Sequence, residues 1–199
     1  MKEYQLYKAI VIGGSAGSFP VLMKVLSQLD PDFRLPLIVC LHRLKHVREG
    51  LVEALSIKSV LRTLEPNDKQ KIEPGVVYLA PANYHMYVEL GNSIALSTEE
   101  MVNYSRPSID LTLETAGYAY KNRLIGILLS GANRDGAYGM KRIKEYGGLT
   151  IVQNPEECKI DTMPRAAMEA TRIDHVYDTD RIVAFLNMVS RRKKMLTTS

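Results

Sequence analysis

The distribution of apolar residues along the chain predicts strands and helices in alternation. Short apolar runs predict strands, and longer stretches with apolar residues at helical spacing predict helices between them. The expected strands cover residues 8–12, 37–41, 76–80, 124–129 and 149–152. The expected helices cover residues 19–29, 47–56, Ile109–Tyr120 behind a Ser108 cap, 136–146, 163–170, and a last helix through 189 that Asp180 caps.

Several of these strands are apolar throughout, which is typical of parallel strands that helices cover on both faces. A different pattern surrounds Gly91-Asn92, where residues 84–90 and 93–97 flank a strong hairpin signal. The pattern therefore predicts an α/β fold: a three-layer, doubly wound, mostly parallel sheet with helices on both faces and an antiparallel edge hairpin. Because no repeat or linker is visible, we expect residues 1–199 to form a single domain.

Composition narrows the class of protein. The hydrophobic fraction of 46% and the charged fraction of 24% are typical of a globular domain. The net charge of +4 is mild and includes the run at 191–194, which we interpret as a solvated end, so no nucleic-acid partner is expected. No signal peptide and no apolar run of membrane-spanning length is present, so no membrane insertion is expected.

The cysteines indicate the compartment. Cys40 and Cys158 are far apart and form no C-x-x-C, and Cys40 lies in the apolar run 37–41, which predicts a buried free thiol. The sequence contains no disulfide framework and no obvious set of metal ligands. We therefore expect a cytoplasmic protein without a structural metal.

The turn after the first expected strand carries the first candidate for chemistry. Gly13-Gly14-Ser15-Ala16-Gly17 has the spacing G-x-S-x-G, which places a nucleophilic serine on a tight turn between a strand and a helix. The following helix offers free N–H groups that can hold an oxyanion. The same letters could instead form a loop that cradles a phosphate, or Ser15 could only cap the helix.

Two further strand ends carry complementary groups. His42 closes the expected strand 37–41, and Asp135 lies just beyond the strand 124–129. Parallel strands bring their carboxyl ends to one edge of the sheet, so Ser15, His42 and Asp135 could form a Ser–His–Asp arrangement. Taken singly, His42 could be a structural strand-end histidine and Asp135 an ordinary turn or cap residue.

With these positions in view, the chain resembles the catalytic domain of the chemotaxis protein-glutamate methylesterases of the CheB type. The resemblance runs from about residue 8 to 189 and rests on blocks that occur in the family's order. These blocks are Val11–Ser18, Leu41-His42, Tyr78–Pro81 with His85-Met86, Arg106–Asp110, Gly126–Gly131 with Asp135–Ala137 and Gly139-Met140, Gln153–Pro155, and Met163–Ala167.

The resemblance implies a hydrolase that removes methyl esters from receptor glutamates, releases methanol, and in some members also deamidates receptor glutamines. Ser15 would be the nucleophile, His42 the general base and acid, and Asp135 the residue that orients His42. Backbone N–H groups near Ala16 and Ala132 are the candidates for the oxyanion hole. No cofactor or metal is implied. The expected partners are the methylated cytoplasmic helices of chemoreceptors, and a separate response regulator or kinase is a further candidate.

The chain also departs from the family pattern. Ala16 and Ser18 stand where many members have Thr and Gly, and the charged Arg43 and Arg134 stand where many members have Met and Asn. We expect both arginines either to read an acidic receptor helix at the rim of the site or to be merely solvated. Typical members also carry an N-terminal phosphorylatable receiver domain, whereas this chain begins almost directly on the first expected strand. A stand-alone enzyme, or one whose regulator is a separate protein, is therefore expected.

Two other classes of function stay open on the sequence. The glycine-rich turn could belong to a phosphate- or nucleotide-binding module, although it matches neither G-x-G-x-x-G nor G-x-x-x-x-G-K-[ST]. A family member could also bind receptors or signalling partners without catalysis, because a small misplacement of a triad removes much of its rate.

Overall fold

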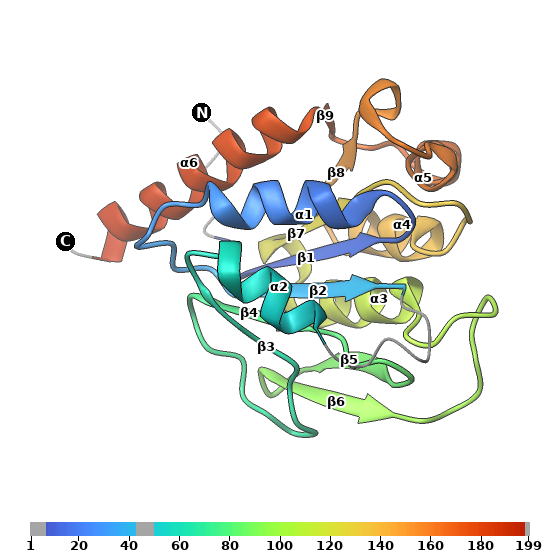
Figure 1. The fold of residues 1–199 in the computed structure, drawn as a ribbon, viewed down its shortest axis with the longest axis horizontal. Coiled ribbons are helices and arrows are strands. Elements are labelled where there is room, and N and C mark those ends of the chain that lie inside the picture. Colours follow the sequence, from blue (N-terminus) through green and yellow to red (C-terminus); the bar gives the residue numbers. More distant parts are fainter. Residues whose placement is uncertain (1–6, 43–49, 198–199) are drawn as a thin grey trace.

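The structure, a computed structural model, describes residues 7–42 and 50–197, and a seven-stranded parallel sheet forms its centre (Figure 1). Each strand runs parallel to its neighbours. The strands in spatial order are β3 (Arg62–Leu64), β4 (Val76–Leu79), β2 (Leu37–Leu41), β1 (Ala9–Gly14), β7 (Leu124–Leu128), β8 (Leu149–Gln153) and β9 (His175–Tyr177). The strands β3 and β9 at the two edges are missing from the sequence-based expectation, because neither three-residue segment forms an apolar run.

Helices cover both faces of this sheet. On one face lie α1 (Ser18–Ser27), α2 (Leu51–Lys58) and α6 (Thr179–Thr197), and on the other lie α3 (Ile109–Tyr120), α4 (Ala137–Glu145) and α5 (Thr162–Ala170). Successive strand residues point to opposite faces, so Ile10 and Ile12 join the first cluster of buried side chains while Val11 joins the second. Two short 3₁₀ helices, η1 (Lys121–Arg123) and η2 (Pro155–Glu157), complete the elements of the described chain. The doubly wound, three-layer architecture is confirmed.

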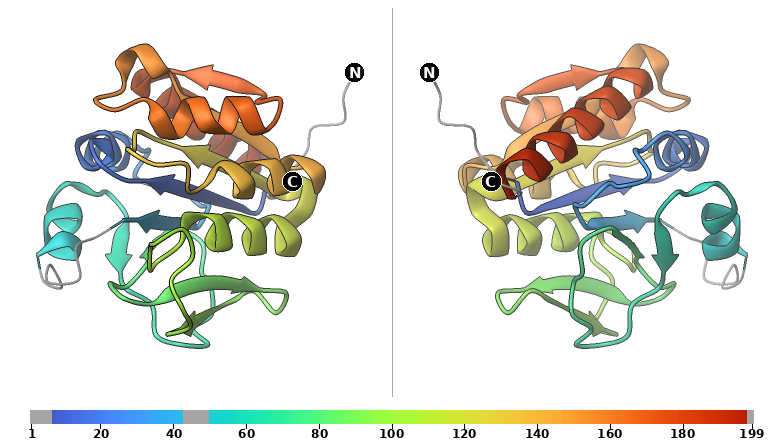
Figure 2. Two further views of the ribbon diagram at one scale, coloured as in Figure 1. Left: turned by 90° about the vertical axis from the view of Figure 1, so that its right-hand side faces the viewer. Right: turned by 90° about the vertical axis from the view of Figure 1, so that its left-hand side faces the viewer.

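The expected hairpin forms, but not at the edge of the main sheet. The antiparallel strands β5 (His85–Glu89) and β6 (Ser93–Ser97) make a sheet of their own, and this sheet packs on the outer side of α3 (Figure 2). Thr112 Oγ1 donates to the carbonyl of Met86 at 2.8 Å, and Val88 N donates to Thr115 Oγ1 at 3.1 Å. These bonds to a helix hold the hairpin away from the sheet, so the edge placement was wrong.

The helix ends show two further differences. Asp180 does not cap the last helix: it lies in the first turn of α6 and pairs with Lys24 at 2.6 Å. The carboxylate that accepts an amide hydrogen bond there is that of Asp178, from Arg181 N at 2.8 Å, because the helix begins at Thr179, two residues earlier than a cap at Asp180 would place it. The helix α6 also continues to Thr197 instead of ending at 189.

The helix expected over 47–56 lies only in part within the described residues. The described part of that region is α2, which begins at Leu51, and residues 43–49 lie outside the described residues. Of the basic run at 191–194, Arg191 binds the carboxylate of Asp30 through Nε at 2.7 Å and Nη2 at 2.9 Å. This arginine therefore fastens α6 to the loop after α1.

The two cysteines agree with the sequence-based expectation. Cys40 is a fully buried free thiol whose burial raises its pKa, and Cys158 is also free. In the described part of the chain, no helix is both long enough and apolar enough to cross a membrane.

Candidate active site

The site forms where β1 meets its two neighbours at the carboxyl edge of the sheet. Gly14 of β1 pairs with Leu41 of β2, and Gly13 pairs with Leu128 of β7. The chain leaves β1 toward one side of the sheet and builds β7, β8 and β9 on the other, which makes this a topological switch point. Ser15 follows β1 and His42 follows β2, and His42 N donates to the carbonyl of Gly14 at 3.1 Å.

Hydrogen bonds to the backbone of Ser15 hold its turn. Ser15 N donates to the carbonyl of Ser130 at 2.9 Å, and Ser18 donates to the carbonyl of Ser15 through its amide at 3.0 Å and its hydroxyl at 2.6 Å. Gly17 has φ 86°, and a Cβ there would lie 2.7 Å from the Cβ of Lys159. Only glycine satisfies both conditions, so the spacing of the motif follows from the tightness of the turn.

A second layer ties this turn to the ends of β7 and β8. Ser130 N donates to Gln153 Oε1 at 3.0 Å, and Ser130 Oγ lies 2.9 Å from the carbonyls of both Ala16 and Ile160. Among the described residues, the buried Nε2 of Gln153 has no hydrogen-bond partner. The turn that carries Ser15 is thus fastened to three strands.

The contact between His42 and Asp135 is the strongest feature of the site. His42 Nε2 lies 2.7 Å from Asp135 Oδ2, and the Asp135 side chain is 0% exposed. Asp135 also accepts from the first amides of α3, Ile109 N at 2.8 Å and Asp110 N at 3.0 Å, and from Ser108 Oγ at 3.2 Å. Burial raises the pKa of Asp135, but the bonds from His42 and from the two amides outweigh it and leave the pKa below its usual value.

This environment fixes the tautomer of His42. An ionised carboxylate can only accept hydrogen bonds, so the proton between the two groups belongs to Nε2 of His42. Nδ1 then carries the lone pair, toward which Asn133 Nδ2 can donate a long hydrogen bond of 3.5 Å. Because Nε2 already holds a proton, Nδ1 is the ring nitrogen that can accept one from a neighbouring group.

Two carboxylates link α3 and α4 beneath the site, because each accepts hydrogen bonds from amides at the start of the other helix. Asp135, which precedes α4, accepts from the start of α3. Asp110, in the first turn of α3, accepts through Oδ1 from Gly136 N at 2.8 Å and Gly139 N at 2.7 Å, and through Oδ2 from Asn103 Nδ2 at 3.0 Å. Burial, aided by the charge of Asp135, raises the pKa of Asp110 to about 6. The pKa values of the two neighbouring carboxyl groups are therefore shifted in opposite directions.

The structure brings some of the candidate residues together and leaves others apart. No hydrogen bond joins Ser15 Oγ to His42, although the two residues follow paired strand residues. Within the described residues, the amides of Ala16 and Ala132 donate no hydrogen bond, so both are available to an anion. Arg134 is exposed and binds Glu169 at 2.9 Å, and Arg43 lies outside the described residues.

Several supporting residues were not identified from the sequence, which predicted Ser108 only as a helix cap. His85 is fully buried, and its Nδ1 accepts from Ser108 N at 3.2 Å while its Nε2 lies 2.9 Å from the carbonyl of Glu100. Local spacing carries no signal for these contacts, because each joins segments that are distant in sequence. Among the described residues, no group of three or more His, Cys, Asp and Glu side chains is placed to hold a metal ion.

Comparisons with known proteins point to one family. The family model described as CheB methylesterase matches residues 10–186. A Leptospira interrogans protein, named as a protein-glutamate methylesterase/protein-glutamine glutaminase on a provisional basis, is 42% identical over 88% of this chain and 91% of its own length. An Archaeoglobus fulgidus protein with the same activity in its name is 34% identical over 90% of this chain, which spans 53% of that protein.

A solved structure gives the same answer for the fold. The crystal structure of the Thermotoga maritima CheB methylesterase catalytic domain superimposes with a TM-score of 0.87 at 30% sequence identity. The match covers 92% of this chain and 98% of that domain.

Proposed function

Because this chain belongs to the CheB methylesterase family, we propose that it hydrolyses the γ-methyl esters of glutamate residues in chemoreceptors, with Ser15 as the nucleophile, His42 as the base and Asp135 as the residue that orients His42. The observation that carries these roles is the 2.7 Å bond from His42 Nε2 to a fully buried Asp135, next to the turn that presents Ser15. This bond leaves a basic nitrogen at the edge of the sheet where the Ser15 turn lies.

In the first half of the reaction, Ser15 Oγ attacks the ester carbonyl while Nδ1 of His42 takes the hydroxyl proton. The resulting imidazolium is stabilised by the ionised Asp135, whose lowered pKa keeps its charge at neutral pH. The amides of Ala16 and Ala132, which donate to no other described group, are suited to hold the oxyanion. The tetrahedral intermediate then expels methoxide, which leaves as methanol with the proton from His42.

In the second half, water attacks the acyl-enzyme. His42 accepts a proton from the water, a second oxyanion forms in the same place, and the Ser15 oxygen departs with the proton that His42 returns. The products are the free glutamate carboxylate and the original enzyme. An amide could follow the same path with ammonia as the leaving group. Relatives named protein-glutamine glutaminase support deamidation of receptor glutamines as a second activity of this site.

The setting of the reaction follows from the same family membership. The proposed partners are the methylated cytoplasmic helices of chemoreceptors, which implies action in the cytoplasm, and a separate response regulator or kinase is the proposed source of control. We treat residues 1–199 as one catalytic domain, which the family match over residues 10–186 supports.

Methanol release from a methylated receptor tests the proposal. The wild-type chain should release methanol, and Ser15→Ala should reduce the rate by at least about a thousandfold. Ser27→Ala is the matched control, because Ser27 is exposed and, among the described residues, its hydroxyl bonds only to the carbonyl of Lys24. Equal rates for wild type and Ser15→Ala would refute the assignment of the nucleophile.

A serine-reactive fluorophosphonate provides a second test that needs no receptor. It should label Ser15 in the wild-type chain and in Ser27→Ala, and labelling should be lost in His42→Gln, because an unactivated serine reacts slowly. Labelling that persists at full rate without His42 would contradict its role as the base.

A further inference from the structure

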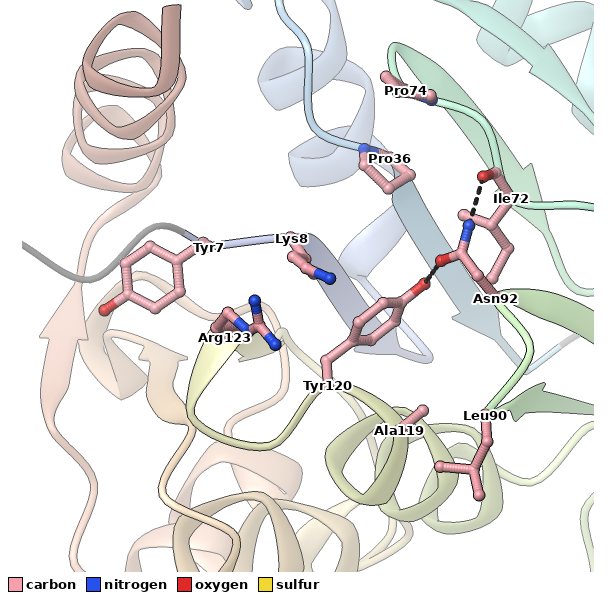
Figure 3. A pocket seen from close by; sticks show the side chains of 10 residues that line it. All are labelled: Tyr7, Lys8, Pro36, Ile72, Pro74, Leu90, Asn92, Ala119, Tyr120 and Arg123. Atoms are coloured by element: carbon pink, nitrogen blue, oxygen red, sulfur yellow. Dashed lines mark hydrogen bonds between the residues drawn. The ribbon is translucent and has the colours of Figure 1, made fainter. Parts of the chain in front are cut away.

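A cavity of about 590 Å³ opens at the amino edge of the sheet, at the opposite ends of the strands from Ser15. It lies between the starts of β1, β2, β4 and β7, the β5–β6 turn and the end of α3 (Figure 3). Its volume falls in the range of small-molecule sites in proteins. The lining residues are Tyr7, Lys8, Pro36, Ile72, Pro74, Leu90, Asn92, Ala119, Tyr120 and Arg123.

The charged residues of this lining are both cations, and the fold places them side by side. Lys8 and Arg123 directly precede the paired residues Ala9 and Leu124 of neighbouring parallel strands. The amide of Lys8 donates to the carbonyl of Arg123 at 2.8 Å, so the ladder of backbone bonds extends to them. Figure 3 shows both side chains in the space between Tyr7 and Tyr120. Like charges on adjacent strands repel each other unless an anion lies between them.

No acidic group of the described chain neutralises this pair. Neither Lys8 nor Arg123 forms an ion pair or a side-chain hydrogen bond within the described residues, and the lining contains no Asp or Glu. The acid that influences this region is Asp174, whose charge adds to the effect of burial in raising the pKa of Tyr7. The carboxylate of Asp174 is already bonded to Lys144, Thr150 N and Thr150 Oγ1.

The rest of the cavity is apolar and firmly built. Tyr120 is 8% exposed, and its hydroxyl donates to Asn92 Oδ1 at 2.7 Å. Asn92 Nδ2 in turn donates to the carbonyl of Ile72 at 2.9 Å. These bonds occupy the polar side-chain atoms of Tyr120 and Asn92, and the hydroxyl of Tyr7 is a further polar group of the lining. The remaining surface comes from apolar side chains: Pro36, Ile72, Pro74, Leu90 and Ala119.

We propose that this cavity is a binding site for a small organic acid, with the carboxylate held by Lys8 and Arg123 and an aliphatic or aromatic body lying on the apolar wall. A guanidinium and an ammonium together offer directed donors and charge to a carboxylate. The apolar wall selects against inorganic anions, because these have no body to bury there. The site is separate from the proposed catalytic residues, so it stands whether or not Ser15 is the nucleophile.

A structural role for the two cations makes a different prediction. Arg123 follows the C-terminus of α3, where positive charge stabilises a helix. If Lys8 and Arg123 served to stabilise the C-terminus of α3, replacing them would lower the melting temperature of the unliganded protein. If they form an anion site, their removal relieves repulsion. The unliganded Lys8→Gln/Arg123→Gln variant should then melt at or slightly above the wild-type temperature.

The test uses 4-phenylbutanoate, its uncharged amide and inorganic phosphate as probes, titrated against the full chain labelled with ¹⁵N. The acid should bind with a Kd on the order of 1 mM and shift amide signals of residues 72, 90–92 and 119–123. The amide and phosphate should each bind at least tenfold more weakly. Lys8→Gln/Arg123→Gln should also weaken binding of the acid at least tenfold.

Two further variants keep the test decisive. Lys58→Gln/Arg62→Gln removes the same charge from exposed positions elsewhere and should bind the acid like the wild type. Ala119→Leu keeps both cations but fills part of the cavity, so it should lose binding of the acid. The proposal would be overturned by equal binding of the acid and the amide, by equal loss in the two double variants, or by no shifts up to about 10 mM acid.

Discussion

The two halves of the candidate active site are held in different ways. The His42–Asp135 half is bonded through its side chains, and its carboxylate is fully buried among four donors. The Ser15 half is held through its backbone, and its hydroxyl has no bond to His42. The fold thus orients the proton acceptor in advance and leaves the attacking oxygen free to turn. Catalytic hydrogen bonds that tighten only when substrate arrives are common in enzymes without ligand.

This difference separates catalysis from stability. In the His42–Asp135 half of the site, the same groups serve catalysis and stability, because Asp135 orients His42 and also accepts hydrogen bonds from amides at the start of α3. In the Ser15 half of the site, the Ser15 side chain contributes only to catalysis, and the glycines of the turn carry the structural role. Substitutions in the two halves should therefore have different signatures.

The largest effect is expected at Asp135. Asp135→Asn should lower kcat by roughly 10⁴-fold, because an amide can no longer accept from Nε2 without turning a donor toward another donor. It should also lower the free energy of unfolding by about 2–4 kcal/mol, since buried donors lose their acceptor. Ser15→Ala should lose activity on a similar scale and change the free energy of unfolding by less than about 0.5 kcal/mol.

The two readouts are methanol release and urea denaturation on the same preparations. The stability loss of Asp135→Asn should shrink as pH falls below the usual carboxyl range, because the lowered pKa of Asp135 contributes stability only while the group is ionised. A stability loss in Ser15→Ala as large as in Asp135→Asn would remove the contrast between the two halves.

The next effect is expected at the turn itself. Gly17→Ala introduces a Cβ at φ 86° and 2.7 Å from Lys159, so the turn must shift. We expect a loss of about 1–3 kcal/mol in unfolding free energy and roughly a hundredfold loss in kcat/KM, because displacing the nucleophile by about 1 Å is costly. Gly50→Ala is the matched control: Gly50 has φ 89°, but among the described residues no atom lies within 4 Å of its Cβ position. Loss of activity in both variants would show that backbone strain in general causes the loss, and not a change in the position of Ser15.

Much of the architecture could be predicted from the sequence, and the supporting contacts could not. Apolar runs predicted the five inner strands because burial on both faces requires them, whereas β3 and β9 are short edge strands with mixed burial. Strand ends pointed to Ser15, His42 and Asp135, because parallel strands share an edge. The roles of Asp110 and Gln153 depend on partners 26 and 23 residues away, so local spacing could not identify them.

A third effect distinguishes the carboxylates of Asp110 and Asp135. The pKa of Asp110 is raised from its usual 3.8 to about 6, so folding favours its protonated form. The stability that this preference contributes is fully present below pH 4 and is lost as pH rises through 6. Asp110→Asn resembles the protonated form, and its amide oxygen can still accept from Gly136 and Gly139. The unfolding free energy of Asp110→Asn minus that of wild type should therefore increase by about 2–3 kcal/mol as the pH is raised from 4 to 7.

Urea denaturation at several pH values measures this difference, and the opposite trend for Asp135→Asn serves as its control. A stability difference between Asp110→Asn and wild type that does not change with pH would show that Asp110 is ionised throughout. The hydrogen bonds of Asp110 and Asp135 across α3 and α4 would then be an ordinary pair of helix caps.

The smallest effect is expected at the rim, outside both halves of the site. Arg134 and Glu169 form an ion pair at 2.9 Å with side-chain exposures of 67% and 64%, and exposed pairs contribute little to stability. Arg134→Gln should therefore change the free energy of unfolding by less than about 0.5 kcal/mol and leave kcat unchanged. If Arg134 reads an acidic receptor helix, KM for methylated receptor should rise severalfold at low salt, and the rise should fade as salt screens the charge. Glu169→Gln frees the arginine and should lower KM under the same conditions. Unchanged KM in both variants would leave Arg134 as a solvated partner of Glu169, and substrate recognition would then depend on other residues around the Ser15 turn.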